Sequence, residues 1–397
     1  MEIKLKIQQL AEGFFNEVSG IRQHIHRHPE LSFQEFETSA YIQEQLRRAG
    51  IPFKTGFVKT GILGIIEGRK PARRVIALRA ELDALPIEEQ NNIPYKSEYT
   101  GRMHACGHDM HMASLLGAAK ILQSLKDEFD GTVLLIFQPG EEKLPGGASL
   151  MLSEGVFNDL TPELIIGQHV LPGLESGKVG YRPGMYMASA DEIYITVNGR
   201  GGHGATPHQV VDPVLIAAQI IVSLQQIVSR NANPAIPSVL SFGKLEAAGA
   251  TNVIPPKVNI EGTFRTMHEP WRAEAHARIT GLARSLAEGM GGTCEIRIVK
   301  GYPVLTNDEI LTRKAAEYSA QLLGEDNVVN LDLRMTSDDF AWFSQKIPGV
   351  FYRFGIMDAA GKFNSPVHSP TFMADEGALK TAMSNLAWLA FEFLGEK

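Results

Sequence analysis

The sequence of 397 residues is poor in cysteine, in long apolar runs and in surplus positive charge. Its two cysteines, Cys106 and Cys294, are too few for a disulfide framework in a chain of this length, which favours a reducing compartment. No apolar run approaches the roughly 18 residues of a membrane-spanning segment, and the first residues lack the apolar core and cleavage site of a signal peptide. We therefore expect a cytoplasmic protein without membrane association.

The charge balance bears on the choice of partner. Lys and Arg number 38 against 45 Asp and Glu, which gives a formal net charge of −7. A nucleic-acid-binding protein needs a basic stripe or patch, so nucleic acid is not expected as a partner. Hydrophobic residues make up 44% of the chain, enough for a sizeable core, and at about 100–200 residues per domain the length predicts two or three domains.

Helix-like and strand-like stretches alternate from residue 1 to about residue 185. Short runs rich in Val, Ile and Leu are typical of buried parallel strands, and amphipathic stretches separate them. This order predicts an α/β domain with a mostly parallel central sheet. The predicted strands are 62–68, 74–82, 132–138 and 163–170, and the clearest helices are 36–50 and 111–125.

Around residue 186 the pattern changes to strands that alternate apolar and polar residues. The segment reads β-α-β-β-α-β, which is the ferredoxin-like order. The predicted elements are strands at 191–199, 237–243, 257–266 and 293–299, with helices at 213–230 and 270–288. We expect 186–300 to be an inserted satellite domain, with 1–185 and 301–397 forming the catalytic domain. The last segment should return to the first sheet with a helix at 308–323, strands at 328–333 and 350–355, and a final helix at 376–394.

The densest polar cluster is HACGHDMH (104–111), directly before a predicted helix. Cys106 and His108 are two residues apart, so in an extended loop both side chains point to the same side and can reach one metal cluster. Asp109 could orient a ligating imidazole through its second nitrogen. The alternative is an ordinary helix start, with Asp109 as its cap and the histidines in solvent.

Two adjacent carboxylates follow the strand that ends at Phe137, in QPGEEKLPGGA (138–148). Loops after buried strands of α/β sheets commonly build sites. Glu142 could bind a metal while Glu141 takes a proton from a metal-activated water, the usual division in hydrolytic metal sites. The alternative is a solvated pair of charges in a turn rich in Gly and Pro.

His169 and His368 also stand at the ends of β-like segments. Either alone is more typical of a packed or surface residue than of a ligand. Together with Cys106, His108 and Glu142 they give five donors from four loops, enough for two transition-metal ions that share a bridge.

These and further motifs resemble the M20 metallopeptidase family, in particular its aminoacylase/carboxypeptidase-like amidohydrolase branch of hippurate, N-acyl-amino-acid and auxin-conjugate hydrolases. The motifs follow the family's order along nearly the whole chain. They are RAELDALP (79–86), HACGHDMH (104–111), QPGEE (138–142), GQHV (167–170), GGHGATPH (201–208), TNVIP (251–255), GTFRT (262–266) and VHSPTF (367–372).

The resemblance implies a catalytic domain that holds two divalent transition-metal ions per subunit, Zn, Mn, Co or Ni, and a ferredoxin-like satellite. The family's metal positions fall on Cys106, His108, Glu142, His169 and His368. Cys106 takes the bridging place that other branches give to aspartate. Glu141 falls on the general base, and Asp83 falls on the carboxylate that supports a metal ligand.

In the satellite domain the resemblance gives His203 the role of donor to the oxyanion of the tetrahedral intermediate. In many members this histidine comes from a partner subunit, so a homodimer through the satellite domain is an expectation. In monomeric members it closes over its own site, and this alternative stays open. Asn252 and Arg265 fall on substrate-contact positions, where a guanidinium can hold a carboxylate with two hydrogen bonds. A solvated strand residue is the alternative for Arg265.

One motif competes with this interpretation, since GRGGHG (199–204) satisfies the G-x-G-x-x-G pattern of dinucleotide-binding turns. Pro207 interrupts direct entry into a helix, and the stretch 213–230 contains no acidic residue to hold a ribose. Dinucleotide binding is therefore not expected.

Departures from the family's pattern occur at three positions. Glu81 stands where this branch usually has Asp, and Thr336 and Asp338 lie in MTSDDF (335–340), where a form closer to GSEDF is usual. The extra methylene of Glu81 leaves open which supporting contact it makes, and an altered pocket shape is expected around Thr336 and Asp338.

The sequence thus predicts a metal-dependent amidohydrolase that cleaves the amide bond of N-acyl-L-amino acids with a Glu general base. A metallo-carboxypeptidase or dipeptidase needs the same centre and stays open as an alternative. A non-catalytic binder of amino-acid conjugates is a third possibility, although it has no need for Glu141 beside a ligand.

Overall fold

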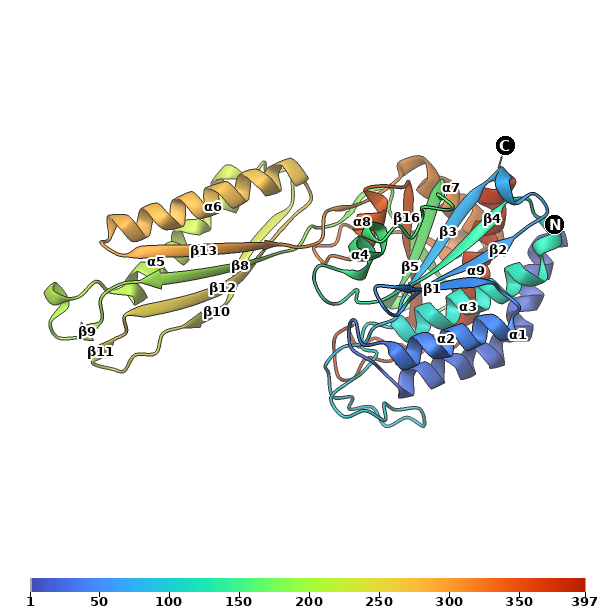
Figure 1. Ribbon diagram of the computed structural model, residues 1–397, viewed down its shortest axis with the longest axis horizontal. Helices are drawn as coiled ribbons and strands as arrows, with labels where there is room; N and C mark the ends of the chain where they lie inside the picture. Colours follow the sequence, from blue (N-terminus) through green and yellow to red (C-terminus); the bar gives the residue numbers. More distant parts are fainter. Residues whose placement is uncertain (1, 397) are drawn as a thin grey trace. The chain divides into compact units, whose positions relative to one another are not determined.

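The computed structural model describes residues 2–396 and consists of two compact units (Figure 1). The first unit takes in the chain as far as Gly184, then Thr306–Asp332, and the chain from Asp339 onward. The second unit comprises Met185–Leu305 and the short segment Leu333–Asp338. Strands β7 (Gly184–Met187) and β14 (Leu305–Asn307) lie where the chain passes from one unit to the other.

The first unit is built on an eight-stranded mixed sheet in the order β1-β2-β4-β3-β5-β16-β6-β15. Its centre is parallel, since β3 pairs in parallel with β4 and β5, and β5 with β16. The prediction of an α/β fold with a mostly parallel central sheet is confirmed. The strands are β1 (Phe53–Phe57), β2 (Gly61–Glu67), β3 (Val75–Glu81), β4 (Thr132–Gln138), β5 (Leu164–Glu175), β6 (Val179–Tyr181), β15 (Val328–Asn330) and β16 (Gly349–Met357).

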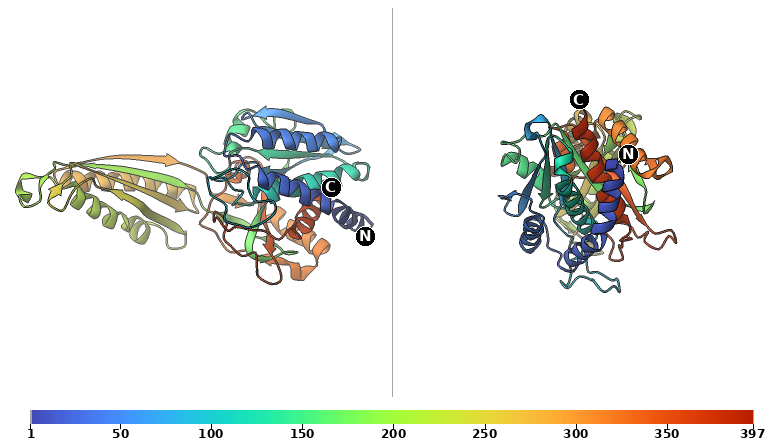
Figure 2. Two further views of the ribbon diagram at one scale, coloured as in Figure 1. Left: turned by 90° about the horizontal axis from the view of Figure 1, so that it is seen from below. Right: turned by 90° about the vertical axis from the view of Figure 1, so that its right-hand side faces the viewer.

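Helices cover both faces of this sheet, which explains why its central strands are apolar on both sides. Helices α1, α3 and α9 pack against one another on one face, and α4 and α8 pack together on the other. Figure 2 shows the N-terminal helix (blue) beside the C-terminal one (red). The helices are α1 (Glu2–Arg27), α2 (Phe36–Arg48), α3 (His108–Ser124), α4 (Gly147–Ser153), α7 (Glu309–Leu323), α8 (Phe340–Ser344) and α9 (Ala378–Gly395).

The second unit has the β-α-β-β-α-β order around an antiparallel sheet, β10-β12-β8-β13. Alternate residues of β8, including Ile193, Ile195 and Val197, face a core that α5 and α6 close. The elements are β8 (Asp191–Asn198), α5 (Pro213–Leu224), β10 (Ser238–Glu246), β12 (Lys257–Thr266), α6 (Glu269–Gly289) and β13 (Thr293–Lys300). A separate two-stranded antiparallel sheet is formed by β9 (Gly202–His203) and β11 (Val253–Ile254).

One element differs clearly from its predicted form. The predicted helix 213–230 ends at Leu224 and gives way to a π-helical turn, Ile227–Asn231. The stretch Pro213–Asn231 is long and apolar enough to span a membrane by length and composition, but Ile216, Ile220 and Leu224 belong to the core of the second unit. The motif GRGGHG (199–204) contains the short strand β9 and does not open an α-helix, as expected for a coincidental match to the dinucleotide-binding pattern.

Candidate metal centre

The parallel strands β3, β4 and β5 deliver polar side chains to one edge of the first sheet. Asp83 follows the last residue of β3, Glu141 and Glu142 follow β4, and His169 lies within β5. The carboxyl ends of parallel strands lie at the same edge, which is where open α/β sheets bind ligands. Helix α3 starts at His108, so the loop that carries Cys106 reaches the same edge.

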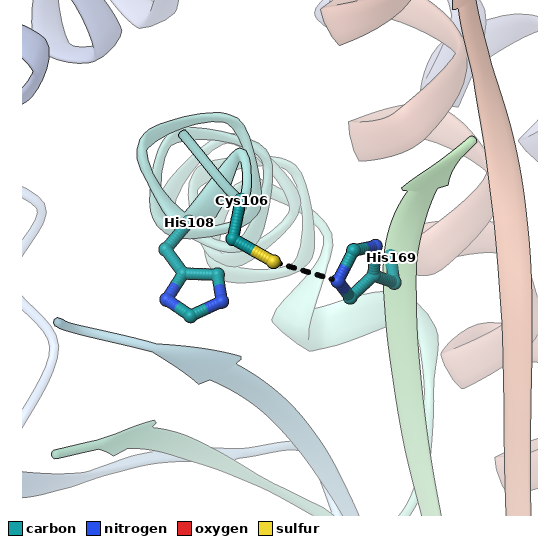
Figure 3. Close-up of side chains that lie close together, drawn as sticks. All are labelled: Cys106, His108 and His169. Atoms are coloured by element: carbon teal, nitrogen blue, oxygen red, sulfur yellow. Dashed lines mark hydrogen bonds between the residues drawn. The ribbon is translucent and has the colours of Figure 1, made fainter. Parts of the chain in front are cut away.

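Cys106 lies at the centre of the cluster. Its Sγ is 3.4 Å from Nε2 of His169 and 3.3 Å from Nε2 of His368. Figure 3 shows the thiol directed at the His169 ring, with His108 beside it. The ligand atoms of Cys106, His108 and His169 all lie within 4.8 Å of one another, and those of Cys106, Glu142 and His368 form a second such group. The thiol is therefore shared between two groups of three donors.

The two glutamates of the β4 turn complete the cluster. Oε1 of Glu142 lies 3.1 Å from Nε2 of His368 and 4.0 Å from Nε2 of His108. Oε2 of Glu141 is also 4.0 Å from Nε2 of His108. The structure thus brings together Cys106, His108, Glu141, Glu142, His169 and His368 from distant parts of the sequence.

Hydrogen bonds determine which histidine nitrogen faces the cluster. Nδ1 of His108 lies 2.8 Å from the backbone oxygen of Asp83, and Nδ1 of His169 lies 2.8 Å from that of Val170. A carbonyl oxygen only accepts, so each Nδ1 carries the proton and donates. Nε2 is therefore the nitrogen that each ring turns toward the cluster, and in the neutral ring its lone pair can bind a metal. Although burial lowers the pKa of His108, Asp83 and Glu81 raise it to about 10, so a bound ion would displace the Nε2 proton of that ring.

This donor set fits divalent transition-metal ions. Among the described residues, Nε2 of His108 is buried without a hydrogen-bond partner. Burial together with Glu142 and Glu141 raises the pKa of the Cys106 thiol well above its usual value. Coordination deprotonates a thiol and neutralises the carboxylates, so cations would satisfy both groups. The combination of thiolate, imidazole and carboxylate suits ions of the zinc, cobalt, nickel or manganese type.

Asp83 lies beneath the turn that carries the two glutamates. Its Oδ1 accepts from the backbone N–H of Glu141 at 3.1 Å, and its Oδ2 accepts from that of Glu142 at 2.9 Å. Oδ1 is also 3.4 Å from Nδ1 of His108. Burial alone would raise the pKa of Asp83, but His108 and the donors from Ser32 and Glu142 hold it below its usual value. Asp83 is therefore an ionised group that orients the turn and the His108 ring.

The prediction that Asp109 orients a ligating imidazole is wrong, and Asp109 does not cap α3 either, since the N-cap residue of that helix is Gly107. Oδ2 of Asp109 bonds to Nε of Arg22 at 2.7 Å and to Nδ1 of His26 at 2.8 Å. Both partners belong to the long helix α1, which the sequence patterns had not identified as an element. Asp109 thus ties the start of α3 to α1.

A buried network below the cluster involves His111, which sequence reasoning did not single out. Nδ1 of His111 is 2.9 Å from Oε2 of Glu81, and its Nε2 accepts from the backbone N–H of Val170 at 2.9 Å. Arg79 bonds to the other oxygen of Glu81. These hydrogen bonds, from Arg79 through Glu81 and His111 to Val170, fix the backbone next to His169. The sequence feature that could have indicated this role of His111 is Glu81, which stands where Asp is usual. Its additional methylene lets the carboxylate reach His111.

The second unit holds the other predicted site residues. Nδ1 of His203 accepts from the backbone N–H of Ala205 at 3.0 Å, and the backbone N–H of Gly204 donates to the oxygen of Asn252 at 2.8 Å. His203 and Asn252 are therefore neighbours at the small β9/β11 sheet, and both are exposed. Arg265 lies on β12 and is half-buried. Its guanidinium donates hydrogen bonds to the hydroxyl oxygens of Thr263 and Ser337.

The segment with the unusual residues Thr336 and Asp338 belongs to the second unit. The backbone oxygen of Thr336 accepts from the N–H of Ala188 at 3.1 Å, and Asp338 is buried. Ser337 between them contacts Arg265 at 3.0 Å. The departures at these positions therefore affect the immediate surroundings of Arg265.

Comparisons with known proteins agree with this arrangement. A model of the peptidase family M20/M25/M40 matches residues 77–390. An N-acetylcysteine deacetylase of Bacillus subtilis (strain 168) is 38% identical, over 96% of this chain and 97% of its own. Thermostable carboxypeptidase 2 of Saccharolobus solfataricus is 35% identical, over 99% of both chains.

Among solved structures, a dinuclear metal binding peptidase of the M20 family from Bacillus subtilis superposes with a TM-score of 0.83. It is 36% identical in sequence, and the match covers 97% of this chain and 99% of that one. The likeness extends over nearly the whole chain, so it includes both units.

Proposed function

Because the chain belongs to peptidase family M20/M25/M40, we propose that it hydrolyses the amide bond of N-acyl-L-amino acids. Members of this family are metal-dependent hydrolases of C–N bonds, and two divalent ions fit the donor cluster of the first unit. The observation that carries the proposal is the pair of donor groups that share Cys106, with Glu141 beside them.

The five donors divide into two sets in this proposal. One ion would bind to Cys106, His108 and His169, and the other to Cys106, Glu142 and His368. Zinc, manganese, cobalt or nickel suit these donors. When bound, such ions lower the pKa of water and polarise the substrate carbonyl.

Glu141 is the proposed general base. Its carboxylate lies next to the cluster without belonging to either set of three, and its Oε1 is within 3.4 Å of the Asp339 backbone N–H. It would take the proton of the attacking water and pass it to the leaving nitrogen, which releases a carboxylic acid and an amino acid.

Two residues of the second unit have proposed roles in substrate binding. Nδ1 of His203 accepts a backbone hydrogen bond, so the neutral ring carries its proton on Nε2, which is the form that can donate to an oxyanion. Arg265, held half-buried by Thr263 and Ser337, would bind the carboxylate of the amino acid, and Asn252 would contact the substrate beside His203.

Substitution of the base tests this proposal. Glu141→Gln should lower kcat for N-acetyl-methionine by about 10²–10⁴-fold, the usual contribution of a positioned general base. The metal content of the purified variant, measured by atomic emission, should equal that of the wild type. Activity within twofold of the wild type with both ions bound would refute the base assignment.

A metallo-carboxypeptidase is the alternative, and the similarity to a carboxypeptidase favours it as a second candidate. A panel of acetyl-, benzoyl- and aminoacyl-amino acids, assayed with each of the four metal ions, separates the two activities. An amidohydrolase should prefer the acyl compounds, whereas a peptidase should reject acetyl-amino acids and cleave dipeptides.

We also propose that two copies of the chain associate through the second unit. Helix α5 buries one side in its own core but leaves Val214, Leu215 and Val222 exposed, the last two by 58% and 67%. An apolar face of this kind marks an interaction surface. Leu215→Glu should convert a dimer into a monomer in light scattering. A wild-type protein that is monomeric at micromolar concentration would contradict this proposal.

A further inference from the structure

The turn that carries Glu141 and Glu142 rests on a second buried carboxylate besides Asp83. Glu35 is fully buried, and its Oε1 accepts from the backbone N–H of Gly140 at 2.8 Å. The backbone N–H groups of Glu141 and Glu142 bond to Asp83. Two carboxylates, Glu35 and Asp83, therefore hold three consecutive backbone N–H groups of the turn.

The position of Glu35 indicates that its side chain is reserved for this turn. Glu35 occupies the N-cap position of α2, but its carboxylate does not cap that helix. Oε2 of Glu30 instead accepts from the Thr38 N–H in the first turn of α2, at 2.8 Å. The two buried glutamates of this segment thus have separate tasks, with Glu30 bonded to α2 and Glu35 to the 139–142 turn.

The remaining contacts of Glu35 fix its carboxylate in place. Oε1 also accepts from the backbone N–H of Phe33 at 2.8 Å, and Oε2 accepts from the Thr60 hydroxyl at 2.9 Å. Phe33 has a φ of 67°, which non-glycine residues rarely adopt. A Cβ added to Gly140 would lie 2.3 Å from the Phe33 ring, so that ring covers the turn directly. Glu35 therefore joins two tight backbone segments that lie against each other.

We propose that Glu35 is a positioning residue, which holds the Gly140 N–H and so sets the direction in which Glu141 and Glu142 project toward the metal centre. This inference rests on the proposed function. The Glu35 carboxylate accepts the backbone N–H groups of both Phe33 and Gly140, and the Phe33 ring lies against Gly140. These contacts leave the 139–142 turn little freedom to rotate. Residues that support metal ligands in this manner typically contribute 10–100-fold to metal affinity or activity.

Two variants of Glu35 distinguish the effect of side-chain length from the effect of negative charge. Glu35→Asp keeps the charge but shortens the side chain by one methylene, so its carboxylate cannot hold Phe33, Gly140 and Thr60 together. Glu35→Gln keeps the length, and its amide can accept from both N–H groups while it donates to the Thr60 oxygen. Glu30→Asp is the matched control, because it shortens the neighbouring buried glutamate that bonds to α2 and not to the turn.

The first readout requires no substrate. The metal-free full-length protein is titrated with Co²⁺ against a chromophoric chelator, and the thiolate-to-cobalt absorption band of Cys106 reports the coordination. We expect Glu35→Asp to weaken Co²⁺ binding by 10–100-fold and to alter the band. Glu35→Gln and Glu30→Asp should stay within threefold of the wild type. The second readout is hydrolysis of N-acetyl-methionine, where Glu35→Asp should lower kcat at least tenfold and change KM less than threefold.

Three results would overturn the inference. They are wild-type Co²⁺ affinity in Glu35→Asp, an equal loss in Glu30→Asp, and a loss above tenfold in Glu35→Gln, which would show that charge and not reach is needed. If Glu35→Asp does not fold, Glu35→Gln still tests the inference, because a loss of Co²⁺ affinity above tenfold in that variant would overturn it. Because cobalt binding is measured without substrate, a wild-type protein that hydrolyses no panel compound would refute the proposed function alone.

Discussion

At the scale of single residues, the site depends on buried charges whose partners come from elsewhere in the chain. Glu81 is fully buried, and although burial raises its pKa, Arg79 and His111 hold it well below its usual value. Removal of one partner from such a group leaves an uncompensated charge, which is why these residues act as a set. The usual Asp at this position would be too short for the 2.9 Å contact that Glu81 makes with His111 without a shift of the backbone.

Glu35 leads to a prediction of pH-dependent stability. Burial, and next the charge of Asp83, raise its pKa from 4.5 to about 7, while Phe33, Gly140 and Thr60 donate to it. The folded state therefore holds the proton more tightly than the unfolded state, and stability falls as pH rises from 4.5 to 7. Glutamine does not ionise, so the Glu35→Gln variant does not lose stability in this way. Its Tm, measured without metal, should exceed that of the wild type increasingly over that range and by a constant amount above pH 7.

The control for this experiment is Glu30→Gln, which alters a carboxylate in the same segment. Its Tm difference from the wild type measures the effect of losing a buried carboxylate that bonds to α2 and not to the turn. A Tm difference for Glu35→Gln that is independent of pH between 4.5 and 8 would show that Glu35 titrates as an ordinary exposed carboxyl.

At the scale of elements, the junction between the Cys106 loop and α3 determines where two donors point. Gly107 has a φ of 82°, and its backbone oxygen accepts from the N–H groups of Met110 and His111 in the first turn of α3. A Cβ at Gly107 would lie 2.8 Å from Val170. Glycine is thus required both for the left-handed turn and for the close approach to β5.

Gly107→Ala should accordingly destabilise the protein by about 2–4 kcal/mol, the sum of an unfavourable φ and overpacking against Val170. Urea denaturation of the metal-free protein measures this change. Gly101→Ala is the matched control, since Gly101 has a φ of 72° but no atom within 4 Å of an added Cβ. It should lose only about 1 kcal/mol. Equal losses in the two variants would mean that the contact with Val170 contributes nothing.

At the scale of the whole molecule, metal binding should stabilise one unit and not the other. The candidate ligands all belong to the first unit, and a ligand that binds only the folded state stabilises it by about 2.7 kcal/mol at a hundred times its Kd. Differential scanning calorimetry with Zn²⁺ should therefore shift the transition of the first unit upward. Cys106→Ser should abolish most of this shift, whereas Cys294→Ser, which alters the half-buried cysteine of the second unit, should preserve it. An equal shift in both cysteine variants would place the bound metal elsewhere.

Much of the fold could be predicted from the sequence because local patterns dominate it. The strand TVLLIFQ was predicted at 132–138 and is β4 with the same limits, since a wholly apolar run between turn residues has few other uses. Helix α1 was missed although its buried residues, Ile7, Ala11, Val18, Ile21 and Ile25, recur at helical spacing. Its packing partners α3 and α9 lie far along the chain, so only the tertiary structure shows what this apolar face contacts. The helix after Pro213 ended early, where tertiary contacts replaced the α-helical pattern by a π-helical turn.

The sequence by itself determined the α/β class, the family and the identity of the candidate donors, because residue types and their motif order are local properties. Only the tertiary structure decided how these donors meet. It showed that Cys106 lies between two sets of donors, that Asp109 bonds to α1, and that Glu35 and Asp83 support the 139–142 turn. Such contacts join residues up to hundreds of positions apart, and they depend on which strands are neighbours in the sheet. No local pattern in the sequence specifies that order.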